Sequence, residues 1–257
     1  MVEPSATEHR VSVLVPVYNE ERTVATVLER VLALPFPLDI VVVDDGSSDR
    51  THDVVAAVAA REPRVRLFRQ TVNQGKTAAI RRAIAEATGT ILIVQDADLE
   101  YDPAEIPEVL APILSGHADV VYGSRFLVRR AARVLYFYHY LANSGLTFLS
   151  NLLTNRNMTD IETCYKAFRA GVIKPLTLTS RGFGMEVEIT AMVSQTRART
   201  YEVPISYYGR SYEEGKKIGL LDGVMALYYI LYFNLIAPRL SAGRRYVQEV
   251  NRNLASL

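Results

Sequence analysis

The chain has 257 residues, of which 49% are hydrophobic, and its formal net charge at pH 7 is +1. This length suffices for one large α/β core or two small ones. Because positive and negative charges balance, the protein as a whole has no electrostatic attraction to nucleic acid, and nucleic acid is not expected as a partner. Any anion must therefore be bound by local clusters of side chains.

Cysteine content and the start of the chain indicate the compartment. A single cysteine, Cys164, excludes an intrachain disulfide framework and a cysteine-based zinc site, and it fits a reducing environment. Residues 1–10 are polar and include acids, without an apolar stretch of signal-peptide length. The sequence therefore predicts that the catalytic part stays in the cytoplasm.

The first half of the chain alternates short apolar runs with helical patterns. The apolar runs predict strands that begin at Val11, Leu38, Val65, Thr90 and Asp119. Helical patterns fill the gaps, over residues 20–34, 48–61, 75–87 and 103–114. Strands at a regular pitch with a helix in each gap predict βαβ units and a mostly parallel sheet. No break in composition occurs before residue 120, so this half is predicted to be one domain.

The fourth apolar run, residues 91–94, leads directly into three acids, Asp96, Asp98 and Glu100. Carboxylates are costly to bury, so these acids are expected where the strand leaves the sheet. If the backbone stays extended, alternation places all three on one side, where their oxygens suit Mg²⁺ or Mn²⁺. The alternative is a solvated acidic loop. A position at the carboxyl end of a parallel strand favours the metal site.

The loops after the second and third strands hold further candidates. Asp45 can accept hydrogen bonds from a nucleoside base or a ribose hydroxyl, and Gly46 permits a tight turn. The alternative role for Asp45 is a helix cap without a ligand. Lys76 begins the next helical pattern, whose N–H groups could meet phosphate. No Gly-x-Gly-x-x-Gly follows a strand and residues 209–217 match a P-loop poorly, so dinucleotide binding and nucleotide triphosphate hydrolysis are not expected.

Four motifs together resemble one enzyme family. They occupy residues 16–20 (Pro-Val-Tyr-Asn-Glu), 44–47 (Asp-Asp-Gly-Ser), 96–98 (Asp-Ala-Asp) and 123–125 (Gly-Ser-Arg). In this order and at this pitch the chain resembles a family 2 glycosyltransferase. Within the family it is similar to the dolichol-phosphate mannose and glucose synthases, which move a hexose from a sugar nucleotide to a polyprenyl phosphate.

The resemblance implies the GT-A fold, a Rossmann-like α/β fold with a mostly parallel sheet and helices on both faces. A single catalytic domain would span residues 1–219, and an amphipathic helical tail would follow over residues 220–257. On the donor side, the nucleoside would be held by Pro16, Tyr18, Glu20 and Asp45, and Asp96 would contact the nucleotide as part of the acidic metal-binding set.

Further implied roles concern the metal and the leaving group. Asp98 and Glu100 would coordinate Mg²⁺ or Mn²⁺ on the diphosphate, and the metal would offset charge on the departing nucleoside diphosphate. The family often has glutamine where this chain has Glu100, so this position departs from the pattern. Residues 208–218 resemble a lid with Arg210 and Lys216 as candidates for diphosphate or acceptor phosphate.

The acceptor side would be built from the second half of the chain. Residues 133–154 predict a helix with His139 and Asn143 on one face, and these with Arg125 and Arg210 could bind the acceptor phosphate. The alternatives are a solvated basic helix whose histidine packs in the core, or cations that face anionic lipid. Asp160 lies in a segment similar to the family's Thr-Asp stretch that faces the acceptor, which makes it a candidate for orienting acceptor or sugar.

Residues 158–169 and 182–188 contain other polar side chains. The first segment reads as a loop that feeds a strand, and it is closer to the glucose-synthase form than to the Thr-Gly-x-Phe-Arg form of mannose synthases. Cys164 within it is expected to be a packed small residue. Glu186 and Glu188 open a predicted helix, where its dipole favours acids. A polyprenyl phosphate is already an anionic nucleophile, so no strong general base is required.

Near its end the chain has an apolar stretch of eleven residues, 223–233. This is well short of the roughly 20 residues needed to span a bilayer. Tyrosines and flanking cations suit a helix that lies in the headgroup region as a peripheral membrane contact. The alternative is a core helix, or the interface of a homodimer, in a soluble enzyme.

The resulting expectation is an inverting, metal-dependent hexosyltransferase at the cytoplasmic membrane face. Its donor would be a sugar nucleotide of the GDP-mannose or UDP-glucose type, and its acceptor a polyprenyl (dolichyl) phosphate. Asp98, Asp160 and Arg125 are the candidate catalytic residues. One alternative is the same fold acting on a soluble or polysaccharide acceptor. Another is a sugar-nucleotide-binding or nucleotidyl-transferring protein, which would have no use for an acceptor phosphate site.

Overall fold

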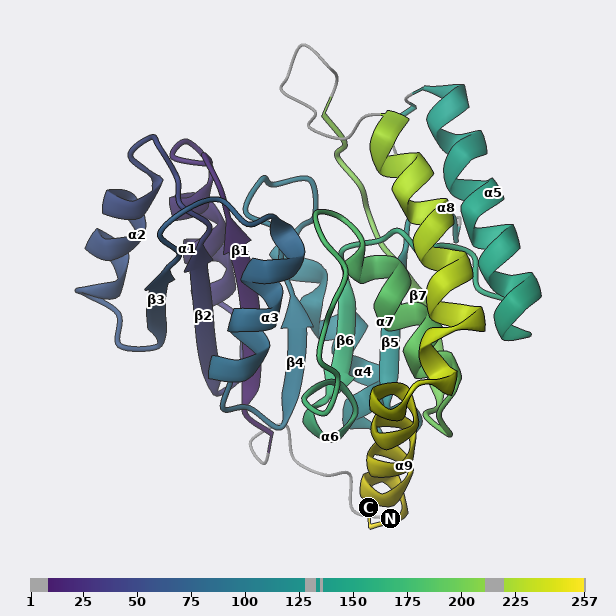
Figure 1. The fold of residues 1–257 in the computed structure, drawn as a ribbon. Helices are drawn as coiled ribbons and strands as arrows, with labels where there is room; N and C mark the ends of the chain where they lie inside the picture. The colour runs from purple at the N-terminus through teal and green to yellow at the C-terminus, as the bar shows by residue number, and fades with distance from the viewer. Residues whose placement is uncertain (1–8, 128–132, 135, 211–219, 257) are drawn as a thin grey trace.

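The computed structural model describes residues 9–127, 133–134, 136–210 and 220–256. Over these ranges the strands form one sheet in the order β3-β2-β1-β4-β6-β5-β7 (Figure 1). The strands are β1 (Val11–Val17), β2 (Leu38–Asp44), β3 (Val65–Arg69), β4 (Ile91–Val94), β5 (Val120–Ser124), β6 (Lys166–Arg169) and β7 (Thr200–Pro204). Only β6 runs antiparallel to its neighbours in the described sheet, so the predicted mostly parallel arrangement is confirmed.

Helices cover both faces of the sheet, as predicted. On one face α3 packs against β1 and β2, and α1 lies on the other (Figure 1). The helices are α1 (Val24–Leu32), α2 (Thr51–Ala59), α3 (Lys76–Glu86), α4 (Ile106–Leu114), α5 (Phe137–Thr154), α6 (Ala170–Ile173), α7 (Met185–Ser194), α8 (Leu220–Leu235) and α9 (Ser241–Ala255), with 3₁₀ turns η1 (Pro103–Glu105) and η2 (Ala237–Arg239).

The central strands explain where the site lies. Every residue of β1, β2 and β4 is buried, which is why these strands read as nearly continuous apolar runs. Parallel registration pairs Val11 with Leu38 and Val17 with Asp44, so neighbouring strands end at the same level. The loops after β1, β2 and β4 therefore meet at one edge of the sheet, where ligands bind in open α/β folds.

One predicted helix is shorter in the structure. The helix expected over residues 133–154 begins at Phe137, because Tyr136 is extended and the Arg133 guanidinium donates to the carbonyl of Gly209 at 3.0 Å. Strand β7 ends at Pro204. Beyond it the chain bonds the segment that follows β4, since the Ser206 N–H donates to Glu105 at 2.8 Å.

The C-terminal helices pack on the rest of the molecule. One face of α8 packs against α7 and α5 and contributes Ala226, Tyr229, Ile230 and Phe233 to a second apolar cluster. Helix α9 packs against α6 and α7, and its Tyr246 belongs to the main core. The boundary expected at residue 220 follows residues 211–219, which lie outside the described ranges.

The apolar helix is longer than the sequence predicted. Asn234 lies within α8, and its side-chain amide donates to the Ile230 carbonyl at 2.8 Å. In the described residues the stretch Leu221–Arg239 has 19 residues and a mean hydropathy of 1.3, which suffice by length and composition to cross a membrane. A core helix of a soluble protein passes the same test, and 28% of this stretch is buried.

Candidate active site

A cleft of about 340 Å³ opens at the edge of the sheet where β1, β2 and β4 end. This volume lies within the range of small-molecule sites. The structure brings together there ten residues that the sequence predicted for the site: Pro16, Tyr18, Glu20, Asp45, Lys76, Asp96, Asp98, Glu100, Arg125 and Arg210.

Three other predicted residues are placed differently, and a fourth lies outside the described residues. His139 and Asn143 lie on α5 and do not line the cleft, and the His139 ring centroid is 5.4 Å from that of Tyr136. Asp160 is buried beneath the cleft wall rather than in its lining. Lys216 lies outside the described residues.

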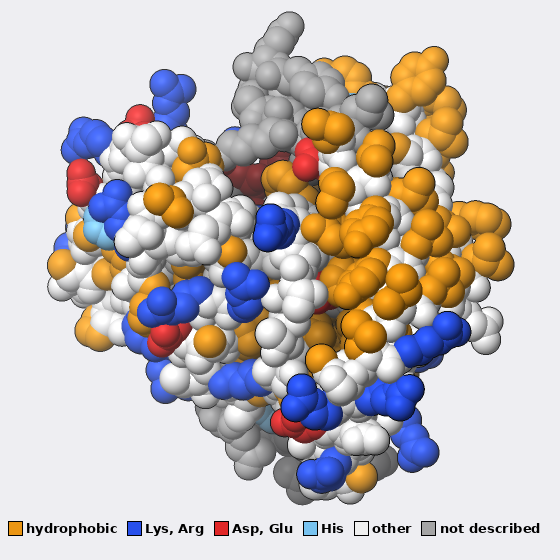
Figure 2. Space-filling model, viewed as in Figure 1, with side chains coloured by type: hydrophobic (Ala, Val, Ile, Leu, Met, Phe, Trp, Pro, Cys, Tyr) orange, Lys and Arg blue, Asp and Glu red, His pale blue; other side chains and the backbone are white. Residues whose placement is uncertain are grey.

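The cleft is strongly acidic. Among the described residues that line it, seven side chains are acidic and three are basic. Figure 2 shows acidic side chains at the bottom of a hollow in this face of the molecule. Each of the three cations already contacts a carboxylate: Lys76 bonds Asp96, Arg125 bonds Asp160, and Arg210 bonds Glu20. An anionic ligand here would therefore face excess negative charge unless a cation accompanied it.

The acidic loop after β4 does not stay extended. Leu99 adopts a left-handed conformation with φ of 64°, and the Glu100 N–H donates to the Asp98 carboxylate at 3.1 Å. This turn directs the Glu100 carboxylate toward the segment after β7, where the Tyr207 hydroxyl and the Arg210 N–H each donate to it at 2.8 Å. The extended backbone expected for this segment is therefore wrong, whereas the role of the three acids as metal ligands stays a prediction.

No group of three or more His, Cys, Asp or Glu side chains within the described ranges is arranged to hold a metal. Asp96 and Asp98 both line the cleft, and their negative charges repel each other. Burial, and then the charges of Asp96 and Glu100, raise the pKa of Asp98 to about 7. Negative charge at Asp98 is thus poorly compensated by the protein alone.

Asp45 and Lys76 organise the start of α3. The carboxylate of Asp45 accepts the N–H groups of Gln74 at 2.9 Å and Gly75 at 2.7 Å, so it holds this loop as well as lining the cleft. Burial raises the pKa of Asp45, although these two hydrogen bonds oppose the shift. The Lys76 ammonium lies 2.9 Å from Asp96 and 3.1 Å from Glu186. It bridges two carboxylates rather than standing free for a phosphate.

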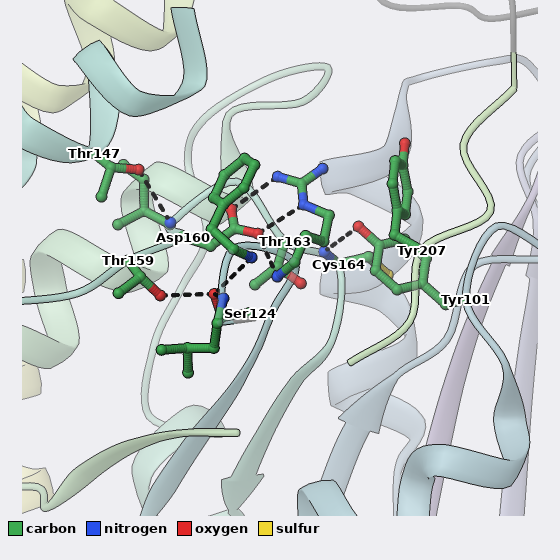
Figure 3. A network of polar contacts seen from close by, with 12 residues as sticks. Tyr101, Ser124, Thr147, Thr159, Asp160, Thr163, Cys164 and Tyr207 are labelled. Atoms are coloured by element: carbon green, nitrogen blue, oxygen red, sulfur yellow. Dashed lines mark hydrogen bonds and ion pairs between the residues drawn. The ribbon is translucent and has the colours of Figure 1, made fainter. Parts of the chain in front are cut away.

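Arg125 is held by a buried partner. Its guanidinium makes two hydrogen bonds to Asp160, of 2.7 and 2.8 Å, and its backbone N–H makes a third of 3.1 Å, within the network around Asp160 in Figure 3. The Asp160 side chain is fully buried, whereas Arg125 reaches the cleft and lies 5.2 Å from the Tyr207 ring centroid. In this geometry Asp160 meets a ligand only through Arg125.

Arg210 joins segments from opposite ends of the chain. Its guanidinium donates to Glu20 at 3.0 Å and to the backbone carbonyl of Asp98 at 2.7 Å. The segment after β7 is thereby tied to the loops after β1 and β4. Arg210 forms part of the cleft wall beside the acidic loop.

Sequence reasoning missed several lining residues: Tyr101, Glu162, Cys164, Phe183, Glu186 and Tyr207. Cys164 is buried, as predicted, and burial raises the pKa of its thiol. The helix dipole was expected to account for one of the two acids Glu186 and Glu188. The Glu188 carboxylate instead accepts the N–H groups of Thr179 and Ser180, whereas Glu186 points into the cleft. The two acids are two positions apart in the sequence and therefore lie on different helix faces. This spacing already indicated that they have different partners.

Comparisons with known proteins agree with this geometry. Residues 12–177 match the model of glycosyl transferase family 2. The dolichol-phosphate mannosyltransferase of Pyrococcus furiosus is 29% identical over 214 residues, which are 82% of this chain and 60% of that protein. The undecaprenyl-phosphate mannosyltransferase of Micrococcus luteus is 28% identical over 220 residues, which are 83% of this chain and 90% of that protein. This chain therefore matches less than two thirds of the length of the Pyrococcus protein.

Solved structures support the fold. Glucosyl-3-phosphoglycerate synthase from Mycobacterium tuberculosis, in complex with Mn²⁺, UDP and glucosyl-3-phosphoglycerate, has a TM-score of 0.68 and 19% sequence identity, covering 88% of this chain and 80% of that chain. The likeness at this identity concerns the fold. The family match extends over more than half of the chain. The protein therefore belongs to glycosyl transferase family 2 and is a glycosyltransferase with a GT-A fold.

Proposed function

We propose that this enzyme transfers a hexose, with inversion, from a sugar nucleotide to a polyprenyl phosphate at the cytoplasmic face of a membrane. The observation that carries the donor side is the acidic cleft at the carboxyl edge of β1, β2 and β4. The acceptor class is supported by the relatives, which are named dolichol-phosphate and undecaprenyl-phosphate mannosyltransferases. Direct attack on the sugar carbon opposite the nucleotide accounts for inversion.

The residues present fit a divalent cation at the cleft. Asp96 and Asp98 supply carboxylate oxygens, and the raised pKa of Asp98 reflects negative charge that a cation would relieve. A hard divalent metal supplemented by diphosphate oxygens and water needs only one or two protein carboxylates. Such a metal offsets charge on the departing nucleoside diphosphate. The synthase of similar fold was crystallised with Mn²⁺ and UDP, which supports Mg²⁺ or Mn²⁺ as the cofactor.

The donor's nucleoside is assigned to the loops after β1 and β2. Pro16, Tyr18 and Asp45 line this part of the cleft. Each Asp45 oxygen accepts one backbone N–H, and a carboxylate oxygen has a second lone pair for a ribose hydroxyl or a base N–H. This side of the site therefore holds the nucleotide while the sugar extends further into the cleft.

The acceptor phosphate is assigned to Arg125 and Arg210. A guanidinium matches phosphate geometry, and the buried Asp160 fixes the Arg125 fork in one orientation. The phosphate already carries the negative charge of a nucleophile, so the protein must position it rather than remove a proton. The Tyr207 ring beside Arg125 completes this wall of the cleft.

Membrane contact is assigned to the outer faces of α5 and α8. Large apolar side chains are exposed there, including Phe137, Phe148, Leu152, Leu221 and Val224. Figure 2 shows this apolar area on the α5 and α8 side of the molecule, with Lys and Arg side chains near its lower margin. Because the opposite face of α8 packs on α7, the helix fits a position along a membrane surface rather than across it.

Transfer is tested by incubating the protein with Mn²⁺ or Mg²⁺, labelled sugar nucleotides and a short polyprenyl phosphate. Metal-dependent formation of labelled lipid from one donor would support the proposal and identify the sugar. Donor hydrolysis without lipid product would redirect the acceptor to a soluble metabolite or a polysaccharide. Nucleotide-sugar binding without any transfer would favour the binding-protein alternative. Asp98→Ala should abolish transfer, whereas Arg210→Ala should chiefly raise KM for the lipid.

Membrane contact is tested by sedimentation with anionic vesicles. Phe148 and Val72 are both strongly exposed, but Phe148 lies on α5, whereas Val72 lies in the loop after β3 and outside the proposed membrane face. Phe148→Asp should lower the vesicle-bound fraction several-fold, and Val72→Asp should leave it unchanged. Equal binding by both variants would contradict the assignment. If Phe148→Asp instead halves the molecular mass of the protein in solution, the outer face of α5 and α8 is a homodimer interface.

A further inference from the structure

We infer that Glu162 and Glu186 form the subsite that accepts hydrogen bonds from the hydroxyl groups of the donor hexose. The inference rests on the proposed function and assigns the sugar-recognising end of its cleft. Both residues line the cleft and come from separate segments, the loop before β6 and the first turn of α7.

The carboxylate of Glu186 has an unused acceptor oxygen. The residue is 4% exposed, and one oxygen lies 3.1 Å from the Lys76 ammonium. The second oxygen, Oε2, is buried and has no hydrogen-bond partner among the described residues. Oε1 of Glu162 is likewise enclosed and without a donor. Burying a carboxylate oxygen without a hydrogen-bond donor costs free energy, so a ligand with hydroxyl groups would supply the missing donors.

The charge of this region selects the kind of ligand. Two carboxylates lie here, and Lys76, the cation in contact with Glu186, is shared with Asp96. Burial, and then the charge of Glu186, raise the pKa of Glu162 to about 7, although the charges of Lys166 and Arg125 oppose the shift. A phosphate would be repelled by this pair, whereas neutral hydroxyl groups would donate to both. The hexosyl part of the donor has this chemistry, and its diphosphate does not.

Both acids are held in place by buried neighbours. The fully buried Lys166 donates to the carbonyls of Ile161 and Thr163, which flank Glu162 in the chain. Glu188 accepts the N–H groups of Thr179 and Ser180 at 2.8 Å, which fixes the segment that leads into α7. The acceptor oxygens are therefore set before a ligand arrives, as a specific binding site requires.

The location also matches the order of groups in a sugar nucleotide. One ammonium, that of Lys76, touches both Glu186 and Asp96. Asp96 belongs to the acidic loop assigned to the metal and diphosphate, so the subsite adjoins the position of the leaving group. The donor hexose is bonded directly to that group. The hydroxyl subsite and the diphosphate subsite are thus neighbours, as the donor's covalent structure demands.

Calorimetric titration tests the assignment with two ligands, a nucleoside diphosphate and the same nucleotide carrying the hexose, each with Mn²⁺. Glu186→Gln should weaken binding of the sugar nucleotide about tenfold, because a charge-assisted hydrogen bond is lost, and leave the nucleoside diphosphate within about twofold. Glu162→Gln should act in the same direction. The control is Glu249→Gln, the same change at an exposed position on α9, which should alter neither affinity.

A second measurement keeps the wild-type chain intact. Sugar nucleotides that lack one hydroxyl at a time should include one that binds the wild type about tenfold more weakly, and this penalty should nearly vanish in Glu186→Gln. Equal penalties in wild type and both variants, or no penalty for any hydroxyl, would overturn the subsite while nucleotide binding and transfer persisted. If the wild type bound no nucleotide at all, the proposed function itself would fail, and the subsite with it.

Discussion

Asp98 combines a buried position with two acidic neighbours in the loop after β4. Burial, and then the charges of these two neighbours, raise the pKa of Asp98 to about 7. Its carboxyl group is therefore mostly protonated at pH 6 and mostly ionised at pH 8. For a raised carboxyl pKa the folded state favours the protonated form, and stability is lost as the pH rises through the folded-state value. A divalent cation binds the ionised form and should reverse this loss.

We expect Mn²⁺ to raise the melting temperature more at pH 8 than at pH 6, with metal binding about tenfold weaker at pH 6. Thermal unfolding and metal titration at both pH values measure this. Asp98→Asn, which cannot ionise, should remove the difference between the two pH values. A metal affinity that is the same at pH 6 and pH 8 in the wild type would exclude Asp98 as a ligand.

The buried ion pair of Arg125 and Asp160 is a second feature that depends on single residues. Arg125 is 11% exposed and Asp160 is fully buried, so their mutual attraction offsets a large desolvation cost. Removing one charge leaves the other buried without compensation. The pair therefore contributes to stability as a unit, and only Arg125 extends into the cleft.

Asp160→Asn should lower the free energy of unfolding by about 3 to 5 kcal/mol, because the buried guanidinium loses its counter-charge. The double variant Arg125→Met/Asp160→Leu should regain most of that stability, since apolar residues of similar size can replace a buried pair. It should nevertheless be inactive, because the proposed acceptor site has lost its cation. Urea unfolding and transfer assays separate the two effects. Activity in the double variant would show that Arg125 has only a structural role.

Among the elements, the turn after β2 sets the width of the cleft. Gly46 has φ of +72°, and a Cβ there would lie 2.8 Å from the Val72 carbonyl carbon and 2.9 Å from the Asn73 nitrogen. Those atoms belong to the loop that Asp45 holds at the start of α3. A side chain at Gly46 would therefore push apart two loops that together line the nucleotide end of the cleft.

Gly116 provides a matched control for Gly46. Its φ is +76°, and a Cβ there would meet nothing within 4 Å. Gly116→Ala should cost about 1 kcal/mol, because only the left-handed backbone disfavours alanine. Gly46→Ala should cost about 2 kcal/mol more, from the added backbone clash, and should weaken nucleotide binding. Chemical unfolding of both variants tests this, and equal losses would mean that the two loops separate freely.

Across the whole molecule, the C-terminal helix is tied to the catalytic core. Tyr246 of α9 is 3% exposed within the core, and its hydroxyl has no hydrogen-bond partner in the described residues. The Asn253 side chain also donates to the carbonyl of Gly171 in α6 at 2.9 Å. These contacts tie α9 to the core, and the division into a catalytic domain over residues 1–219 and a tail over residues 220–257 stays a prediction.

Tyr246→Ala should lower the free energy of unfolding by about 3 to 5 kcal/mol through the cavity it creates. Tyr246→Phe removes only an unpartnered buried hydroxyl and should be neutral or slightly stabilising. A single cooperative unfolding transition should persist in both variants. If Tyr246→Ala left the main transition unchanged, α9 would be an appendage that folds independently of the core.

The order of residues along the chain was enough to predict the alternation of strands and helices, the parallel core and the family. It also placed the acids after β4 at the carboxyl end of a parallel strand, because periodicity is a local property. Ten residues predicted from this pattern or from the family resemblance line the cleft. Pro16, Asp45 and Asp98 each follow, or end, a strand whose position the pattern already gave.

The pairing of those side chains could be known only from the folded chain. Glu100 turns to Tyr207, Lys76 bridges Asp96 and Glu186, and Arg210 bonds Glu20, a residue 190 positions away in the chain. A carboxylate's partner depends on which distant segment packs beside it, and no local pattern carries that information. The same holds for α9, whose amphipathic sequence suits either a surface tail or a core helix until its neighbours in space are known.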